Sequence, residues 1–380
     1  MLNRPRILIL SANTGGGHNA VAHALQEAFM ARLPDATVSV VDGLREGTTW
    51  PFNRFDRTHS WMASQARWAM RLMFWADAQP QLTQILYGPG AKWACTGLRQ
   101  IIRHHQPDVI ISVQPHLTQL LARMKKSALK SIPLIAVVTD LVEAPHTCFH
   151  SAVDLCLVAT EETRRQALAL GLAPDQVAVV GLPISLALNC GDPAPPPPWG
   201  RLGGGVVLLM GGSQGYGGPM TQIAQAIDKR LTAKHRLIIV TGRNQPLKQE
   251  LEAMTWRRSV TVLGFVADMP SVLATADVLV TKAGPSSLAE AFAAGLPTIL
   301  FGHFPGPEAS NVRHVVENGA GLYCADPDGI AEILDRWLVV GNHTLLTLSQ
   351  NAHQLSRPRA ALDAVDRIIE RFGLEGSDED

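Results

Sequence analysis

The chain has 380 residues, of which 46% are hydrophobic and 17% charged, so it can bury two ordinary cores and is too apolar for a disordered protein. Its five cysteines are scattered without C-x-x-C spacing, which argues against a disulfide framework or a zinc site and favours a reducing compartment. No apolar run approaches the roughly 20 residues of a transmembrane helix, and the chain enters a predicted strand too early for a signal peptide.

The formal net charge is zero, but the charge is unevenly distributed. Residues 1–130 contain 15 basic and 7 acidic side chains, a net charge of +8, and the remaining residues carry the compensating −8. A basic N-terminal part indicates an anionic partner for that part, while a solvated basic face without a partner is the plainer alternative.

Apolar strand patterns alternate with helical patterns along the whole chain, which predicts an α/β protein with parallel sheets. Strands of a first sheet are expected within 6–12, 37–43, 107–113, 132–140, 154–160 and 176–181, and strands of a second within 206–212, 236–242, 260–266, 276–284, 296–302 and 320–326. We predict two Rossmann-like domains, over 1–188 and 206–345, that face a cleft. The Pro- and Gly-rich stretch 189–205 is expected to link them, followed by a helix over 346–372 that packs back on the first domain and a disordered tail over 373–380.

The region 45–95 contains five of the eight tryptophans. Trp61, Trp68 and Trp75 recur every seven residues, which predicts that they share one helix face beside a polar arc that includes Arg67 and Arg71. Such a helix suits a membrane interface, and a helix whose tryptophans cap a core is the alternative.

The first strand is followed by three glycines and a histidine, Gly15, Gly16, Gly17 and His18. The spacing Gly15, Gly17, Ala20 also fits a dinucleotide-binding turn, with Asp42 at the end of the second strand for a ribose. A single G-x-G-x-x-A is weak evidence, and His18 would crowd a pyrophosphate. An imidazole can instead take a proton near neutral pH.

Glycine-rich turns follow several strands of the second domain. Three segments present backbone N–H groups or side-chain donors to an anion: the turn after 206–210, the sequence "VTGRN" with Arg243, and the turn 282–287 before a helix. Glu290 lies one turn inside that helix, where it could reach ribose hydroxyls. No P-loop motif is present.

The stretches "SANTGGGH", "VTDL", "LMGG", "GRN", "GFVADM", "TKAGPSSLAEA", "GLPTIL" and "PGPEASNV" resemble, in order over about residues 6–322, the monogalactosyldiacylglycerol synthases and processive diacylglycerol glucosyltransferases. These enzymes are related to the N-acetylglucosaminyl transferase of peptidoglycan synthesis. The resemblance implies the two-domain GT-B fold, inverting transfer from a UDP-sugar, and no bound metal or other cofactor.

The resemblance assigns His18 as the general base on the acceptor hydroxyl and Asp140 as a candidate to orient or charge-stabilise it. It implies that Phe265 and Val266 hold uracil, Glu290 the ribose and Glu308 the sugar, with Asn311 in support. The full set of expected donor-binding residues is Gly211, Gly212, Ser213, Gln214, Arg243, Phe265, Val266, Lys282, Ala283, Gly284, Ser286, Ser287, Glu290, Glu308 and Asn311. Gly15, Gly16, Gly17 and His146 are expected near the acceptor, because the glycines would let it approach the main chain.

The expected activity is transfer of galactose or glucose from a UDP-sugar to diacylglycerol, at the cytoplasmic face of an anionic membrane, with no nucleic acid involved. Another lipid acceptor (a polyprenyl-linked sugar or a ceramide), an NAD-dependent oxidoreductase, and a binding protein that has lost catalysis are the alternatives.

Overall fold

The computed structural model describes residues 4–13, 16–77, 79, 82–83, 85, 87–88, 94–125, 127–188, 204–215, 218–339 and 343–374. The chain divides into two compact units. The N-terminal unit comprises Met1–Leu186, Pro305–Pro307 and Arg359–Asp380, and the C-terminal unit comprises Ala187–Phe304 and Glu308–Pro358. The predicted linker 189–205 lies outside the described residues except for Gly204 and Gly205.

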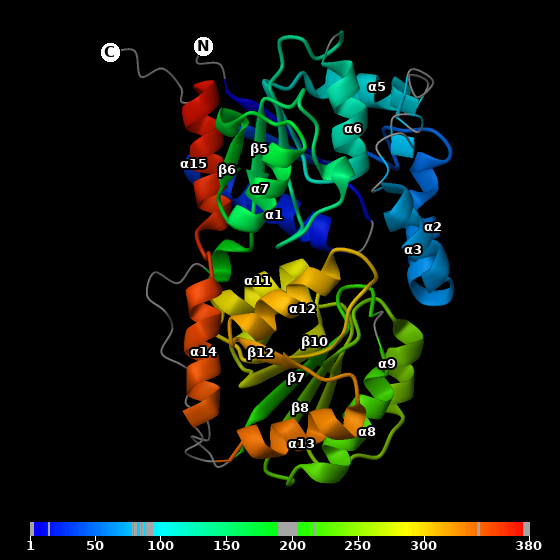
Figure 1. The fold of residues 1–380 in the computed structure, drawn as a ribbon, viewed down its shortest axis with the longest axis vertical. Helices are drawn as coiled ribbons and strands as arrows, with labels where there is room; N and C mark the ends of the chain where they lie inside the picture. Colours follow the sequence, from blue (N-terminus) through cyan, green and yellow to red (C-terminus); the bar gives the residue numbers. More distant parts are fainter. Residues whose placement is uncertain are drawn as a thin grey trace. The chain divides into compact units, whose positions relative to one another are not determined.

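The N-terminal unit is built around a parallel sheet with the strand order β2-β1-β3-β4-β5-β6 (Figure 1). Its strands are β1 (Arg6–Ser11), β2 (Thr37–Asp42), β3 (Val109–Ser112), β4 (Leu134–Val137), β5 (Leu155–Val158) and β6 (Val177–Val179). Its helices are α1 (Gly17–Arg32), α2 (Phe55–Gln65), α3 (Arg67–Asp77), α5 (Thr96–His105), α6 (Pro115–Met124), α7 (Glu161–Ala169) and α15 (Ala360–Phe372).

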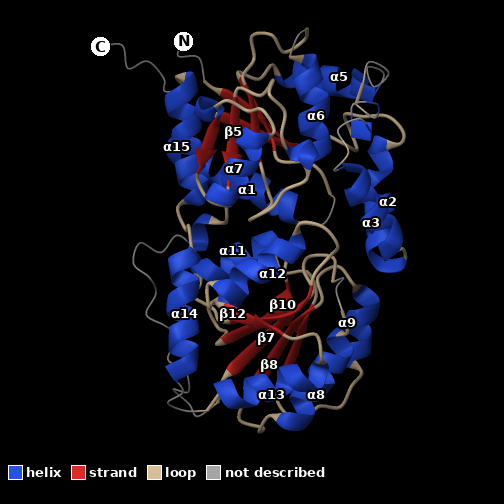
Figure 2. Cartoon of the chain, viewed as in Figure 1, coloured by secondary structure: helices blue, strands red, loops and turns tan. Residues whose placement is uncertain are grey.

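The C-terminal unit contains a second parallel sheet with the order β12-β11-β10-β7-β8-β9, flanked by helices (Figure 2). Its strands are β7 (Val206–Met210), β8 (Arg236–Val240), β9 (Val260–Leu263), β10 (Val278–Lys282), β11 (Thr298–Gly302) and β12 (Gly321–Tyr323). Its helices are α8 (Met220–Arg230), α9 (Gln245–Glu252), α10 (Met269–Leu273), α11 (Pro285–Ala293), α12 (Glu308–Glu317), α13 (Pro327–Trp337) and α14 (His343–Leu355).

Burial on both faces explains why the strands are continuously apolar. In β7, Val207 and Leu209 belong to one core cluster, whereas Leu208 and Met210 belong to another on the opposite face. Successive side chains of a strand alternate between faces, so each of these residues packs against a different helical layer. The predicted α/β class with two Rossmann-like domains is confirmed.

In each sheet the first strand lies between the strand that follows it in sequence and a later one. The order reverses between β1 and β3 in the N-terminal sheet and between β7 and β10 in the C-terminal sheet. Ligands of open α/β sheets bind outside the carboxyl ends of the strands at this reversal. The candidate site residues are therefore expected at these two edges.

Three local expectations differ from the structure. The predicted C-terminal helix over 346–372 is broken between Leu355 and Ala360, because Pro358 disfavours a helical residue before it. Only the second part, α15, belongs to the N-terminal unit, where it packs on α1. The disordered tail was predicted to begin at residue 373, but the ordered structure extends further. Gly373 caps α15 in a left-handed conformation, and Leu374 is buried. Residues 375–380 lie outside the described chain.

The third difference concerns the tryptophan region, where a single helix was expected to carry Trp61, Trp68 and Trp75. The structure ends α2 at Gln65 and begins α3 at Arg67, with Ala66 in a non-helical conformation. Met62, Ala66 and Met70 are buried around this break, but their spacing of four residues also fits one continuous helix, so their burial does not explain the break. The three tryptophans are thus divided between two helices.

Candidate active site

The turn after β1 is held by an asparagine of the following helix. Asn19 accepts a hydrogen bond from the Ser11 hydroxyl (2.6 Å) and donates one to the Asn13 side chain (3.1 Å). Gly16 caps α1 with a φ of 113°, a conformation that favours glycine. Gly17 begins the helix, and Gly15 lies outside the described residues. Gly16 therefore allows a sharp entry into α1, which places His18 at the edge of the sheet.

His18 is the second residue of α1, and its ring is oriented by the ends of two neighbouring strands. Its Nδ1 lies 2.8 Å from the Val113 carbonyl oxygen, after β3, and 2.9 Å from the Thr139 hydroxyl, after β4. A carbonyl oxygen can only accept, so Nδ1 carries the hydrogen of the neutral ring and Nε2 carries the lone pair. This tautomer makes Nε2 the atom that can take a proton.

Asp140 follows Thr139 and lies beside Cys148. The Cys148 thiol donates to the Asp140 carboxylate at 3.8 Å. Burial, together with the nearby carboxylates of Asp140 and Asp77, raises the pKa of Cys148 well above its usual value, so this thiol stays protonated at neutral pH. An orienting role of Asp140 on His18 stays a prediction.

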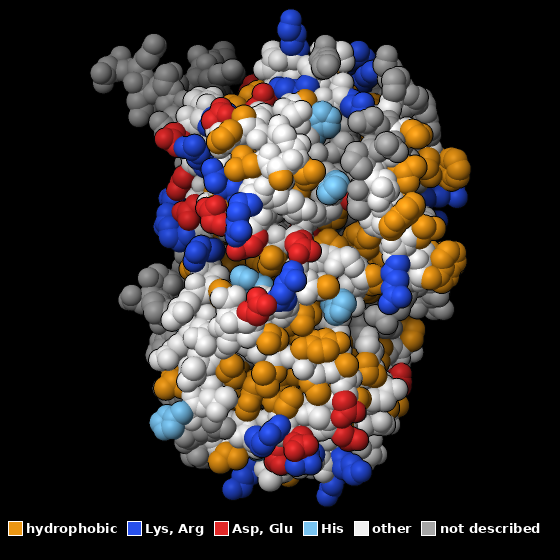
Figure 3. Space-filling model, in the orientation of Figure 1, with side chains coloured by type: hydrophobic (Ala, Val, Ile, Leu, Met, Phe, Trp, Pro, Cys, Tyr) orange, Lys and Arg blue, Asp and Glu red, His pale blue; other side chains and the backbone are white. Residues whose placement is uncertain are grey.

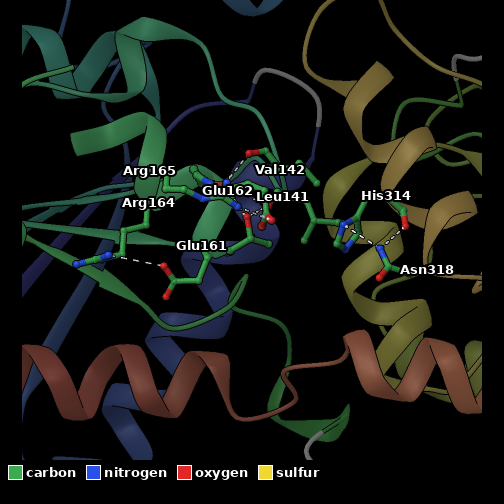
Figure 4. A network of polar contacts seen from close by, with 10 residues as sticks. Leu141, Val142, Glu161, Glu162, Arg164, Arg165, His314 and Asn318 are labelled. Atoms are coloured by element: carbon green, nitrogen blue, oxygen red, sulfur yellow. Dashed lines mark hydrogen bonds and ion pairs between the residues drawn. The ribbon is translucent and has the colours of Figure 1, made fainter. Parts of the chain in front are cut away.

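The segment after β4 is anchored by side chains from two helices. The Thr163 hydroxyl of α7 donates to the Val142 carbonyl (2.9 Å) and lies 3.3 Å from that of Leu141. Figure 4 shows Leu141 and Val142 near the Glu161–Arg164 ion pair of the same helix. Gln119 of α6 donates to the carbonyls that flank Cys148, at 3.0 Å and 2.9 Å. These bonds fix the backbone that carries Thr139 and Asp140.

Sequence reasoning missed Thr139, Gln119 and Asp77. Thr139 could have been found, because it follows β4, which only β3 separates from β1, the strand that precedes His18. Asp77, the last residue of α3, accepts hydrogen bonds from Thr147 in the turn His146–Cys148. Burial raises the pKa of Asp77, while those hydrogen bonds lower it. The sequence carried no signal for this contact, because the two residues lie far apart in the chain. His146, an expected acceptor-side residue, belongs to the same turn.

The surface over α2 and α3 exposes large apolar side chains. Trp61, Trp68 and Trp75 are 53%, 69% and 58% exposed, and Leu72 is also exposed. Figure 3 shows hydrophobic side chains gathered over these helices, with basic side chains among them. Arg71 is exposed, and the side chain of Arg67 lies outside the description. Exposed tryptophans in this number do not cap a core, so the alternative of a packed helix loses its basis.

In the C-terminal unit, the turns after β7 and β8 contact each other at the sheet edge. The Arg243 N–H donates to the Ser213 carbonyl (2.9 Å), and a Cβ on Gly242 would meet that same oxygen at 2.3 Å. The predicted turn residues Gly211, Gly212, Ser213 and Gln214 are therefore fixed in a close backbone approach. Such turns present N–H groups to anions.

Arg243 is also brought to the residues after β9. Its guanidinium lies 4.6 Å from the centroid of the Phe265 ring, and Phe265 is exposed. Val266 instead packs against the core cluster on one face of the sheet. Phe265 thus offers a ring face at the sheet edge, and the uracil contact predicted for both residues stays a prediction.

The turn between β10 and α11 carries the remaining donor candidates. Gly284 caps α11, and Pro285 begins it, so the N–H groups of Ser286 and Ser287 lie in its first turn. Asn311 donates to the Ala283 carbonyl (3.0 Å) from α12 and holds this turn.

Three buried polar atoms gather at this turn without a hydrogen-bond partner among the described residues: Thr281 Oγ1, Ser286 Oγ and Asn311 Oδ1. Buried atoms of this kind cost about 1–3 kcal/mol each when nothing satisfies them. They leave unmet hydrogen-bonding capacity beside this turn.

Two carboxylates lie near this turn in different environments. Burial raises the pKa of Glu290, inside α11, to about 7. Glu308, at the start of α12, instead forms an ion pair with Lys282 (2.5 Å). No group of three or more His, Cys, Asp or Glu that could hold a metal ion occurs within the described ranges.

Comparisons with known proteins cover nearly the whole chain. A family model described as monogalactosyldiacylglycerol (MGDG) synthase matches residues 18–184, and one described as glycosyltransferase family 28 C-terminal domain matches residues 206–368. A probable monogalactosyldiacylglycerol synthase of Nicotiana tabacum is 35% identical over 96% of this chain and 69% of its own length. Monogalactosyldiacylglycerol synthase 1 of Arabidopsis thaliana is 34% identical over 97% of this chain and 71% of its own length.

Solved structures share the fold at lower identity. MurG of Acinetobacter baumannii matches with a TM-score of 0.60 and 15% identity, over 96% of this chain and all of its own. HepE of Anabaena, solved in complex with UDP and glucose, matches with a TM-score of 0.57 and 15% identity, over 97% of this chain and all of its own. These likenesses show the GT-B fold. Among the helices of the described chain, none is long and apolar enough to span a membrane.

Proposed function

Because the chain belongs to the monogalactosyldiacylglycerol synthase family, we propose that it transfers galactose or glucose from a UDP-sugar to the hydroxyl of diacylglycerol and inverts the anomeric centre. The observation that carries this proposal is the orientation of His18, whose Nδ1–H faces the Val113 carbonyl and leaves the Nε2 lone pair as the proton acceptor. The family's glycosyltransferase chemistry leaves the oxidoreductase alternative without support.

In the proposed reaction, His18 Nε2 takes the proton of the lipid hydroxyl as its oxygen forms a bond to C1 of the sugar. The bond between C1 and the phosphate oxygen breaks, and UDP leaves with the electron pair. Backbone N–H groups of the turns after β7 and β10, with the Lys282 ammonium, stabilise the charge that develops on UDP. The Val113 carbonyl and the Thr139 hydroxyl stabilise the imidazolium that forms.

On the donor side, we assign Phe265 and Val266 to the uracil, Glu290 to the ribose and Glu308 to the sugar hydroxyls. The positions of these residues after β9, in α11 and at the start of α12 support this assignment, because they follow the carboxyl ends of three strands of one parallel sheet, β9, β10 and β11. The reaction requires no metal in this scheme, because N–H groups and Lys282 supply the positive charge.

The activity is tested by incubating the protein with radiolabelled UDP-galactose or UDP-glucose and diacylglycerol in anionic mixed micelles, and then separating the lipids. A labelled glycolipid formed with one donor establishes the reaction and identifies the sugar. UDP binding without any lipid product would move the acceptor to another lipid, such as a ceramide or a polyprenyl-linked sugar, which the same assay can test.

We further propose that the exposed tryptophans of α2 and α3 bind the surface of an anionic membrane, where diacylglycerol resides. Indole rings settle at the headgroup level, and the basic N-terminal part attracts anionic lipid. Trp68→Ala is expected to weaken binding to vesicles that contain anionic lipid by about 10-fold, because burial of such a side chain contributes roughly 1.5–3 kcal/mol.

The matched control for Trp68→Ala is Met30→Ala, which removes an exposed apolar side chain from α1. It should leave vesicle binding unchanged. Binding of the wild-type protein should also weaken as salt is added, since Lys and Arg supply part of the attraction. Equal binding by Trp68→Ala and the wild-type protein would contradict the membrane proposal.

A further inference from the structure

The ion pair between Lys282 and Glu308 is among the least exposed of the protein. The two side chains are 14% and 13% exposed, and the ammonium lies 2.5 Å from Glu308 Oε1. The other carboxylate oxygen accepts the Phe304 N–H at 2.8 Å. The ammonium also lies 4.7 Å from the centroid of the Phe304 ring. Both oxygens of Glu308 are therefore engaged by the protein itself.

Two glycines make room for this lysine at the point where the strand order reverses. A Cβ on Gly284, the cap of α11, would lie 2.9 Å from Lys282 Nζ, and a Cβ on Gly212, after β7, would lie 3.4 Å from its Cε. The ammonium is thus placed between the two turns whose N–H groups are assigned to the diphosphate. A diphosphate bound there would compete with Glu308 for the same ammonium.

The competition favours the diphosphate on electrostatic grounds. Glu308 offers one negative charge, whereas the diphosphate of UDP carries at least two, and Coulomb attraction scales with the charge. Once the lysine has turned to the diphosphate, the Glu308 carboxylate has lost its cation. An ionised carboxylate that is mostly buried then requires new hydrogen-bond donors, and sugar hydroxyls supply them.

We infer that the Lys282–Glu308 pair is a donor-dependent switch, in which the diphosphate of the nucleotide draws Lys282 away and thereby makes Glu308 available to the hydroxyls of the attached hexose. This inference rests on the proposed function. It makes Glu308 a specificity residue that recognises the sugar only after the diphosphate is bound. Phe304 positions the carboxylate through its N–H, and its ring faces the ammonium.

A static clamp is the competing arrangement, and it predicts the opposite change in the affinity for UDP when the charge of Glu308 is removed. If Glu308 serves only to hold Lys282 in place for the diphosphate, its loss weakens binding of UDP. If the pair is a switch, loss of the Glu308 charge frees Lys282 to meet the diphosphate, so UDP binds more tightly.

The test is titration calorimetry of UDP, UDP-galactose and UDP-glucose, without acceptor, against the wild-type protein and the variants Glu308→Gln, Lys282→Met and the double variant. We expect the wild-type protein to bind UDP-sugar more tightly than UDP. Glu308→Gln should bind UDP about 3- to 10-fold more tightly than the wild-type protein and should lose this preference for UDP-sugar. Lys282→Met should bind UDP at least 10-fold more weakly. In the double variant the gain from Glu308→Gln should largely disappear.

Glu332→Gln is the matched control, since Glu332 is exposed on α13. Its affinity for each nucleotide should equal that of the wild-type protein. The double variant replaces the buried pair by two neutral side chains, so it keeps the comparison available if either single variant fails to fold in circular dichroism.

Weaker or unchanged UDP binding by Glu308→Gln would overturn the switch and favour the clamp. The switch would also be overturned if Glu308→Gln increased the affinity for UDP by the same factor in the Lys282→Met background, because the increase would then not depend on the lysine. Failure of the wild-type protein to bind UDP at all would instead refute the proposed function. The two failures are therefore distinguishable within one set of titrations.

Discussion

The carboxyl edges of the two sheets use a similar backbone arrangement for different chemistry. In each sheet the first strand ends in a glycine-containing turn beside a later strand, where the strand order reverses. In the N-terminal unit the side chain brought there is His18, which contacts the Val113 carbonyl and the Thr139 hydroxyl. In the C-terminal unit it is Lys282, which is paired with a carboxylate.

This difference matches the task proposed for each unit. Uncharged partners orient an imidazole without fixing its charge, which suits a group that gains and loses a proton in every turnover. A permanently charged ammonium with a removable counter-ion suits the binding of an anion. Under the proposed function, the same open α/β frame serves proton transfer in one unit and anion binding in the other, through the polar side chains placed at the strand ends.

The strongest test of the difference between the two units is removal of the His18 imidazole. His18→Ala is expected to lower kcat for transfer to diacylglycerol by about 10²- to 10⁴-fold, the usual contribution of a general base. The affinity for UDP should not change, since the donor residues lie in the other unit. Label transfer and calorimetric titration with UDP measure the two effects.

His23→Ala, which removes an exposed histidine from the same helix, serves as the control and should keep the wild-type rate. If the His18→Ala protein retained most of its transfer rate, His18 would not be the general base. The proposed difference between the two units would then no longer hold.

A smaller effect is expected from the hydroxyl that orients the ring. Thr139→Val keeps the shape of the side chain but removes its contact with His18 Nδ1, while the Val113 carbonyl remains. Loss of one neutral hydrogen bond corresponds to about 2- to 10-fold in rate. We expect kcat to fall by that factor with KM for the UDP-sugar unchanged. A rise in KM alone would place Thr139 outside the orientation of the base.

The smallest effect concerns the ionisation of Glu290 in the C-terminal unit. Because burial raises the pKa of Glu290 to about 7, above its unfolded value, the folded protein holds this proton more tightly than the unfolded chain does. The free energy of unfolding therefore decreases as the pH rises through the window that ends near 7. Glu290→Gln cannot ionise, so it avoids this loss.

We expect Glu290→Gln to raise the Tm of the ligand-free protein by about 2 °C or more at pH 8 and to change it little at pH 5, as measured by differential scanning calorimetry. The exposed Glu317→Gln is the control and should shift the Tm at neither pH. Equal shifts of Glu290→Gln at both pH values would mean that the carboxyl is not held protonated by burial.

Much of the fold followed from local patterns, whereas the geometry of the site did not. Strands such as β7 were predictable because both of their faces are buried, which makes the sequence continuously apolar. The glycine turns before α1 and α11 were predictable as sharp connections. The resemblance in motifs predicted the family, and the comparisons confirm it.

What the sequence could not supply are contacts between residues distant in the chain. The bond from His18 to Val113 spans 95 residues, and that from Thr139 to His18 spans 121. The pairing of Lys282 with Glu308 depends on how α12 packs beside the end of β10. The break at Ala66 between α2 and α3 is likewise hidden from a helical wheel, which assumes one continuous helix.

The return of α15 to the N-terminal unit has a consequence for dissecting the protein. Its ion pair from Asp366 to Arg32 (2.6 Å) and its packing on α1 involve residues that follow the whole C-terminal unit in the sequence. A fragment that stops at residue 188 would leave the α1 surface beneath α15 bare and prone to aggregate. An isolated N-terminal half would have to carry residues 359–374 grafted behind it, whereas residues 187–358 could be expressed as one continuous stretch that includes Pro305–Pro307.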